Sequence, residues 1–243
     1  LDSFLAGNSA HNSPNGNHET NDPILLTEID SAPLFNSSIQ KRAEYENEKV
    51  PLIITKCIAE VEKRGLDVEG IYRISGGNSA IVAIENAFAD LPPNSTKDEK
   101  QMRKLEDAIG GDVNAVTSAL KRYLRKLPDP LLPYAYYDEF IKVALSISAN
   151  KQDKRINELK LKVINKLPPT NKHVLFLICK HLDLVNSYAL VNRMNFKNLS
   201  VVFAPTLVRD ETGEKEMIHM GYRNDVTELM LTNYQKLFYD YLH

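Results

Sequence analysis

The 243-residue sequence contains no tryptophan and has only two cysteines, Cys57 and Cys179. Two thiols so far apart in the chain give neither the spacing of a metal site nor a disulfide framework. Each lies on what the apolar pattern predicts to be the buried face of a helix. We therefore expect two small buried side chains in a protein of a reducing compartment.

The sequence also lacks an apolar run of about 18 residues, which a membrane-spanning helix would need. Its first residues do not contain the basic and apolar regions of a secretory signal. We therefore expect a cytoplasmic protein without an integral membrane segment. Because the chain begins with Leu1, we also expect a piece of a longer protein, whose other parts would provide any recruitment to the inner face of the plasma membrane.

Neither sign of charge is in excess. The chain carries 30 Lys and Arg residues against 32 Asp and Glu residues, a formal net charge of −2. No global basic field indicates nucleic acid or an anionic membrane as a partner. With 43% hydrophobic and 26% charged residues, the composition is that of an ordinary globular protein, long enough for one large domain or two small ones.

Residues 1–33 differ from the rest of the chain, because asparagine recurs there among Ser, His, Gly and Pro. Such a segment has little apolar surface to bury, so we expect a disordered linker or N-terminal extension. Over residues 34–243 apolar side chains recur at helical spacing, and strand-like alternation is missing. We predict an all-α fold, with a single domain of about nine helices.

Local signals predict where several helices begin and end. Pro51 suits a first helical turn, and Gly65 suits the C-cap of that helix. Asn78 or Ser79 is expected to cap a second helix, and Asp112 a long third one. Further helices are predicted near residues 135–147, 153–167, 171–186, 195–203 and 225–242, and a short one within 92–104.

Signatures of a self-contained catalyst are missing. The sequence contains no GxxxxGK[ST] phosphate loop, no HExxH, no GxSxG and no CxxC. Gly76 and Gly77 precede a helix, but no strand precedes them and no lysine follows in register, so an ordinary turn is favoured over anion binding. His173 and His181 are too far apart on one helix for a metal pair, and we expect surface or packed residues.

The placement of cations on the long third helix is unusual. Lys121 and Arg125 lie one turn apart, beside the apolar stripe of this helix. Arg122 and Lys126 stack further round, toward solvent. Like charges at this spacing repel by about a few tenths of a kcal/mol, which the helix C-terminus partly offsets. The face is either a solvated helix end or a surface for an acidic or phosphate-bearing partner.

Arg73 stands in a short apolar loop, after Ile71 and Tyr72 and before Ile74. A loop arginine is ordinarily a solvated charge, or an anchor bonded to backbone carbonyls. Here the apolar neighbours would pin the loop against the core, and glycines on both sides would let it turn sharply. Such a loop holds a guanidinium at low entropy cost and aims it outward, which suits phosphoryl transfer in a partner's active site.

Three longer blocks of sequence occur in a fixed order. Residues 69–76 read EGIYRISG, residues 120–133 read LKRYLRKLPDPLLP, and residues 192–207 read NRMNFKNLSVVFAPTL. They resemble the arginine-finger loop and the second and third blocks of Rho GTPase-activating protein domains, and residues 51–58 (PLIITKCI) resemble the first core helix of that family. The resemblance covers residues 34–243. It implies an all-helical domain that accelerates GTP hydrolysis by Rho-family small GTPases of the Rho, Rac or Cdc type.

The resemblance also implies a role for each cation. Arg73 matches the catalytic arginine finger, which enters the GTPase active site in trans. Lys121 and Arg125 match a basic pair that steadies the finger loop and contacts the GTPase switch region. The domain would need no cofactor or metal of its own, because the GTP-bound GTPase carries the nucleotide and Mg²⁺.

The third block implies further contact residues. Asn198 matches the asparagine that supports the switch contacts, and Pro205 matches the proline that ends its helix near the GTPase. Asn192 matches an asparagine of less defined role. Two features depart from the family: Ala204 stands where glycine is common, and the segment at residues 92–111 looks longer, which predicts an extra loop or helix that bears on partner choice.

Two other functions would use the same features. A GTPase-binding adaptor would have the same fold without speeding hydrolysis, but the presence of Arg73 favours an activator. A helical scaffold or phosphoinositide-binding domain would use the basic face of residues 120–127, and the near-neutral net charge counts against it. We expect a monomer.

Overall fold

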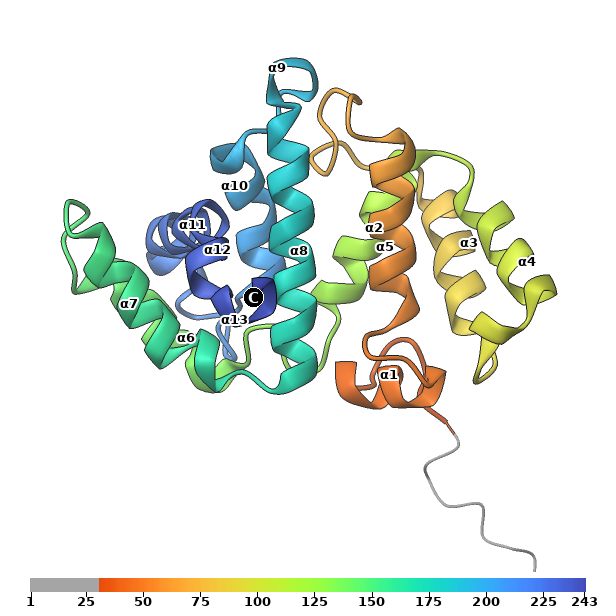
Figure 1. Cartoon of the computed structure of the whole chain (residues 1–243), viewed down its shortest axis with the longest axis horizontal. Coiled ribbons are helices and arrows are strands. Elements are labelled where there is room, and N and C mark those ends of the chain that lie inside the picture. The colour runs from red at the N-terminus through yellow and green to blue at the C-terminus, as the bar shows by residue number, and fades with distance from the viewer. Residues whose placement is uncertain (1–30) are drawn as a thin grey trace, which may run out of the picture. The chain divides into compact units, whose positions relative to one another are not determined.

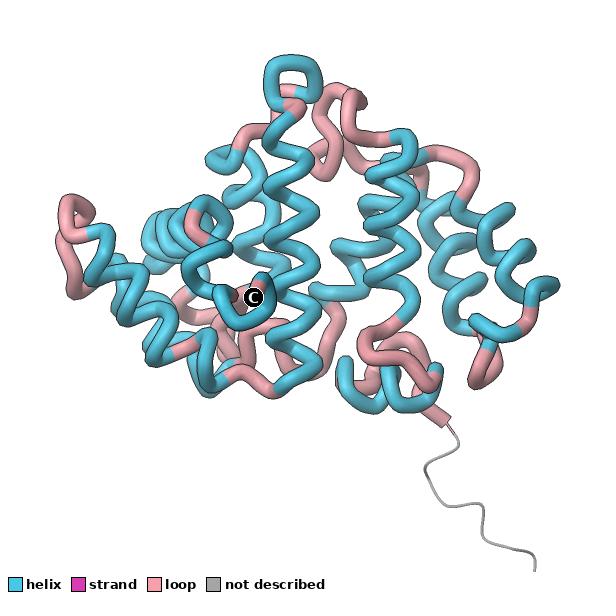
Figure 2. Tube along the Cα trace, viewed as in Figure 1, coloured by secondary structure: helices cyan, strands magenta, loops and turns pink. Residues whose placement is uncertain are grey.

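The structure is a computed structural model that describes residues 31–243, and within this range every regular element is a helix (Figure 2). The all-α prediction is confirmed, with ten α-helices of eight or more residues instead of about nine. Residues 1–30 of the predicted N-terminal extension lie outside the described range. The α-helices are α1 (Ile39–Glu46), α2 (Leu52–Arg64), α3 (Asn78–Ala89), α4 (Glu99–Ile109), α5 (Val113–Arg125), α6 (Tyr137–Leu145), α7 (Gln152–Lys162), α8 (Pro169–Ser187), α9 (Ala189–Asn192), α10 (Phe196–Leu207), α11 (Glu216–Thr232), α12 (Tyr234–Leu237) and α13 (Tyr239–Leu242).

The central helices are α2, α5, α8 and α10, which pack against one another (Figure 1). Helices α3 and α4 extend this group beyond α5, while α11, α6 and α7 extend it beyond α10. Cys57 on α2 and Cys179 on α8 are fully buried among these helices, as predicted, and burial raises the pKa of both thiols. None of the described helices is long and apolar enough to cross a membrane.

Local sequence signals predict the N-cap of α5 correctly, but not the N-cap of α3. Asp112 caps α5 as predicted, since its carboxylate accepts the backbone N–H two residues further on at 2.9 Å. The cap of α3 was wrongly assigned to Asn78 or Ser79, because Gly77 occupies that position. The side-chain oxygen of Asn78 instead accepts a hydrogen bond from Arg122 of α5, at 3.2 Å. A tertiary contact therefore replaces the expected local one.

The C-terminal helix differs most from its prediction. Instead of one helix over residues 225–242, α11 begins at Glu216 and ends before Asn233, where α12 and then α13 follow. The carbonyl of Leu229 accepts both the backbone N–H of Asn233, at 3.1 Å, and its side-chain amide, at 2.9 Å, and these two bonds close the last turn of α11. The first turns of α11 are not predicted by the sequence, because the apolar residues Met217 and Ile218 do not mark a buried face: they are 86% and 76% exposed.

Candidate functional site

Arg73 lies in the loop that joins α2 to α3, at the end of the central helices where α9 also lies (Figure 1). Ile71 and Tyr72 are completely buried and pin the loop, whereas Ile74 is 45% exposed. The amides of Arg73 and Ile74 both donate to the carbonyl of Gly70, at 2.8 and 2.9 Å. The turn is tight because Gly70 and Tyr72 both adopt positive φ, of 73° and 70°.

The side chain of Arg73 is exposed. No hydrogen bond or ion pair joins its guanidinium to another residue of the described range, so it is not an anchor for backbone carbonyls. Because an arginine stays charged at any physiological pH, the loop presents an uncompensated planar cation to solvent. This geometry suits a charge that is meant for another molecule.

The two predicted basic residues of α5 have different surroundings. The ammonium group of Lys121 donates to the carbonyl of Tyr72, and the lysine is only 8% exposed. Burial, followed by the charge of Arg125, lowers the pKa of Lys121 to about 8. Arg125 is exposed near the end of the helix. The structure therefore brings Lys121 to the backbone that precedes Arg73 and leaves Arg125 at the surface.

The second half of the loop is pressed onto α5. The amide of Gly76 donates to Oγ of Ser118 at 3.1 Å, and this hydroxyl donates to the carbonyl of Asn114 at 2.6 Å. A Cβ atom on Gly76 would lie only 2.5 Å from the backbone of Ala115, so only glycine allows this approach. Ser118 is not among the residues predicted from the sequence, although its place one turn before Lys121 puts it on the same side of α5.

A hollow of about 190 Å³ lies beside the loop, between α3 and α5. Two of the cations that line it differ in their contacts. Arg122 is held by α3, since it approaches Glu85 at 3.4 Å, while Arg125 has no ion pair within the described residues. The lining residues are Ser75, Gly76, Asn78, Ile81, Ser118, Lys121, Arg122 and Arg125.

Asn192, whose role was open, is fully buried at the end of α9. Its side-chain amide donates to the carbonyls of Leu66 and Val185 at 2.8 and 2.9 Å, and its side-chain oxygen accepts from the amide of Met194 at 2.7 Å. Its own carbonyl accepts the amide of Gly70 at 2.8 Å. Asn192 therefore ties the Arg73 loop to α8 and cannot be a surface contact.

Asn198 and Pro205 lie two turns apart on α10. Asn198 is exposed, and its side-chain amide donates to the carbonyl of Arg193 at 2.8 Å, which holds the turn before α10. Pro205 does not end the helix as expected, because α10 continues to Leu207. The helix tolerates it in the last turn, where the carbonyl of Val201 loses a partner at an exposed residue. Within the described residues neither side chain hydrogen-bonds to the Arg73 loop.

His181 and Glu62 lie near the loop, and the sequence did not predict their contacts. The hydroxyl of Tyr72 lies 2.6 Å from Nε2 of His181, and Nδ1 of this histidine lies 2.9 Å from Oε1 of Glu62. The only sequence signal was the place of His181 among the apolar residues of α8, which is compatible with simple packing. No group of three or more potential metal ligands occurs in residues 31–243.

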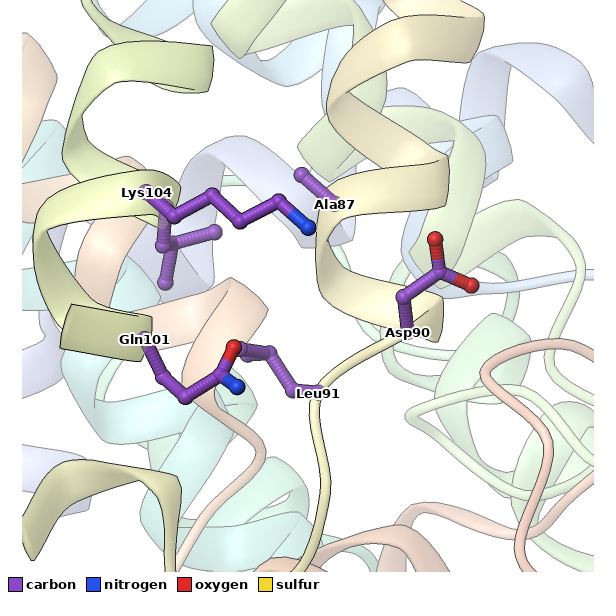
Figure 3. Close-up of a pocket in the computed structure, with 6 residues that line it drawn as sticks. Ala87, Asp90, Leu91, Gln101 and Lys104 are labelled. Carbon is purple, nitrogen blue, oxygen red and sulfur yellow. The ribbon is translucent and has the colours of Figure 1, made fainter. Parts of the chain in front are cut away.

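The segment at residues 92–111 forms a short 3₁₀ turn and then α4, which packs on α3. The predicted helix is therefore present in this segment. Figure 3 shows Lys104 reaching from α4 toward Ala87 of α3, across a hollow of about 40 Å³. A space of this size holds water at most, so this hollow is not a ligand site.

Comparison with known proteins identifies the fold. A model of the RhoGAP domain matches residues 51–212. The chain is 39% identical over 228 residues to Rho-type GTPase-activating protein 2 of Saccharomyces cerevisiae, covering 86% of this chain and 22% of that protein. It is 35% identical over 206 residues to Rho GTPase-activating protein 15 of Gallus gallus, covering 84% of this chain and 41% of that one. The chain thus spans well under half the length of these relatives.

Two solved structures are also similar to this chain in sequence and in fold. The crystal structure of human Rho GTPase activating protein 15 is 36% identical with a TM-score of 0.71, covering 87% of this chain and 94% of that one. The BH domain from GRAF, the GTPase regulator associated with focal adhesion kinase, is 33% identical with a TM-score of 0.64, covering 77% and 93%.

Proposed function

Because the chain belongs to the RhoGAP domain family, we propose that it accelerates GTP hydrolysis by a Rho-family small GTPase, to which it supplies Arg73 in trans. The domain is a regulator that acts in the active site of its partner and has none of its own. The observation that carries the proposal is the exposed guanidinium of Arg73, without a hydrogen bond or ion pair to residues 31–243, on a loop whose backbone is held by Lys121, Ser118 and Asn192.

The proposed mechanism uses what the loop geometry offers. Hydrolysis spreads negative charge over the oxygens of the γ-phosphoryl group, and a planar donor on a loop whose backbone is held in place stabilises this charge with little reorganisation. The GTPase supplies the nucleotide, Mg²⁺ and the glutamine that orients the attacking water. Arg73 enters beside the phosphates, neutralises the developing charge and helps to exclude water.

The other residues of the site serve this finger in two ways. We propose that Lys121 and Asn192 hold the finger loop, since both bond to its backbone. We assign Arg125 to the contact with the switch region, because it is the exposed cation next to the loop. Asn198 and Pro205 are proposed to contact the GTPase from α10, through their exposed or half-exposed surfaces.

The direct test is single-turnover hydrolysis of GTP preloaded on Rho-, Rac- and Cdc-type GTPases, with and without the domain. Strong acceleration on at least one of them is expected, and the ranking identifies the preferred partner. Binding to the GTP-loaded form without any acceleration would contradict the proposal and would make the domain an adaptor.

Arg125→Ala should weaken binding to the GTP-loaded GTPase by about fivefold at low ionic strength, because it removes one exposed charge from the interface. The loss should shrink as salt rises from about 0.05 M to about 0.5 M, since added ions screen exposed pairs. Titration of the complex by fluorescence anisotropy measures this. Arg103→Ala on α4, which removes another exposed arginine, is the matched control and should change little. A loss that does not depend on salt would contradict an electrostatic role for Arg125.

The pH dependence of GTPase activation should show whether the charged form of Lys121 supports the finger loop. Its pKa of about 8 means that Lys121 is charged below this pH and neutral above it. The charge-assisted bond to the carbonyl of Tyr72 therefore weakens as pH rises, and the finger loop loses part of its support.

The expected result is that the maximal hydrolysis rate of the wild-type complex exceeds that of Lys121→Met at pH about 7, and that this advantage narrows toward pH about 9.5. Rates are measured by single turnover at saturating domain. The ratio of the two rates cancels the titration of groups on the GTPase. A ratio that stays constant through pH 9.5 would contradict a role for the charged form.

A further inference from the structure

Tyr72 has a backbone conformation that an aromatic residue rarely adopts. Its φ is 70°, in the left-handed region, where bulky side chains are outliers. Such conformations persist only when the surroundings hold them in several places. Because Tyr72 directly precedes Arg73, the dihedral angles of Tyr72 set the direction in which the chain delivers the arginine.

Three helices hold this residue. Lys121 of α5 donates to its carbonyl, and the ring of Phe203 of α10 packs edge-on against its own ring with centroids 5.0 Å apart. His181 of α8 contacts the far end of the side chain, with Nε2 2.6 Å from the hydroxyl oxygen. The first contact fixes the backbone, and the other two fix the ring.

His181 also contacts α2, through its other ring nitrogen. Its Nδ1 lies 2.9 Å from Oε1 of Glu62, and the carboxylate can only accept, so Nδ1 donates. In the neutral ring Nε2 is then the acceptor for the hydroxyl of Tyr72. The bond to His181 is the main reason that the pKa of Glu62 is lowered, so the carboxylate is ionised at neutral pH. His181 is 2% exposed, whereas the side chain of Glu62 is 40% exposed and ends the chain of hydrogen bonds at the surface.

Packing alone does not require this arrangement. A phenylalanine at position 72 would keep the ring contacts, whereas a buried tyrosine hydroxyl needs a partner or loses stability. The hydrogen-bond chain adds one directional bond from the finger loop to α8, and a second bond that fixes the histidine of α8 to α2. They act on the residue whose conformation is strained and whose neighbour is the finger.

We propose that His181 and Glu62 are positioning residues for Arg73, which they hold in place through the side chain of Tyr72. The inference rests on the proposed function of Arg73. A finger displaced by about 1 Å loses about 100-fold in rate, so releasing one anchor of the loop should show in the chemical step. Binding should change little in variants of Tyr72 and His181, because both side chains are buried and offer no surface to a partner.

The experiment compares Tyr72→Phe and His181→Leu with Tyr137→Phe by single turnover over a range of domain concentrations. Tyr137 is a matched control, since its hydroxyl lies 3.2 Å from Nδ1 of His219 in a second tyrosine–histidine pair, which joins α6 to α11. The maximal rate should fall about tenfold in the two test variants, with the half-maximal concentration changed less than about threefold. The control should retain the wild-type rate.

Two further readouts separate positioning from general damage. His181→Gln keeps an amide group that can donate to Glu62 and a carbonyl oxygen that can accept from Tyr72, and it should recover most of the rate that His181→Leu loses. Amide exchange of the free domain, followed by NMR, should quicken at Arg73 and Ile74 in Tyr72→Phe, because both amides bond to the carbonyl of Gly70 within the turn. This second measurement needs no GTPase.

The outcomes are distinct. Wild-type rates and unchanged exchange in Tyr72→Phe and His181→Leu would overturn the inference while leaving the proposed function intact. A loss of affinity in step with the rate would also overturn it, because the chain would then shape docking. Absence of acceleration by the wild-type domain on every GTPase tested would overturn the proposed function and this inference together.

Discussion

Arg73→Ala is expected to abolish nearly all acceleration of GTP hydrolysis while the domain still binds the GTP-loaded GTPase. Arginine fingers contribute about 10³–10⁵ in rate in the well-studied Ras and Gα systems, and we expect a loss on that scale. The reason is that the guanidinium acts on charge that develops only in the transition state, so its removal affects the rate more than affinity. Single-turnover rates at saturating domain, with affinity measured in parallel, test this.

Arg73→Lys is the informative companion. Lysine keeps the positive charge but presents a single point donor instead of a planar fork, so it should recover little of the lost rate. Both variants should unfold at the wild-type temperature, because Arg73 is exposed and has no hydrogen bond or ion pair within residues 31–243. Wild-type acceleration by Arg73→Ala would refute the role of Arg73 as an arginine finger. A loss of affinity as large as the loss of rate would indicate a role in binding instead.

Gly76→Ser is expected to be the most damaging change in the loop that leaves the finger itself in place. The new Cβ would lie 2.5 Å from the backbone of Ala115, and a helix backbone cannot give way as a flexible side chain can. The loop must move off α5, which breaks the 3.1 Å bond from its amide to Ser118 and shifts Arg73. We expect a rate loss of about 100-fold and a loss in unfolding free energy of about 1–3 kcal/mol.

The matched control is the same substitution one residue later. A Cβ on Gly77 has no atom within 4 Å, and its φ of −66° is open to any residue. Gly77 is also the N-cap of α3, a position that serine favours, so Gly77→Ser should keep or slightly raise stability. Denaturant unfolding and single-turnover rates are measured for both variants. Equal effects at the two positions would contradict the close approach of Gly76 to α5.

Much of the helical architecture was predictable because its signals are local. Apolar residues at helical spacing gave the all-α class, and Asp112 and Gly65 marked ends of α5 and α2 as expected. One error came from a contact outside the local window, since Asn78 turned its side chain to α5. The other came at Asn233, where α11 ends although the apolar pattern continues through it.

The candidate site also has a part that the sequence predicted and a part that it did not. From sequence alone came the exposed arginine in an apolar loop, the cations of α5 and the order of three blocks that indicated the family. The sequence by itself therefore determined the fold class and the candidate finger, since both depend on residues within about two helical turns of each other or on whole blocks of sequence.

Only the tertiary structure decided how the Arg73 loop is held. It buried Lys121 and exposed Arg125, although both are cations one turn apart. It also joined His181 to Tyr72 and to Glu62, residues separated by 109 and 119 positions along the chain. Contacts at such separations form only when helices pack, and a single sequence contains no periodicity or spacing that reports which side chains will then meet.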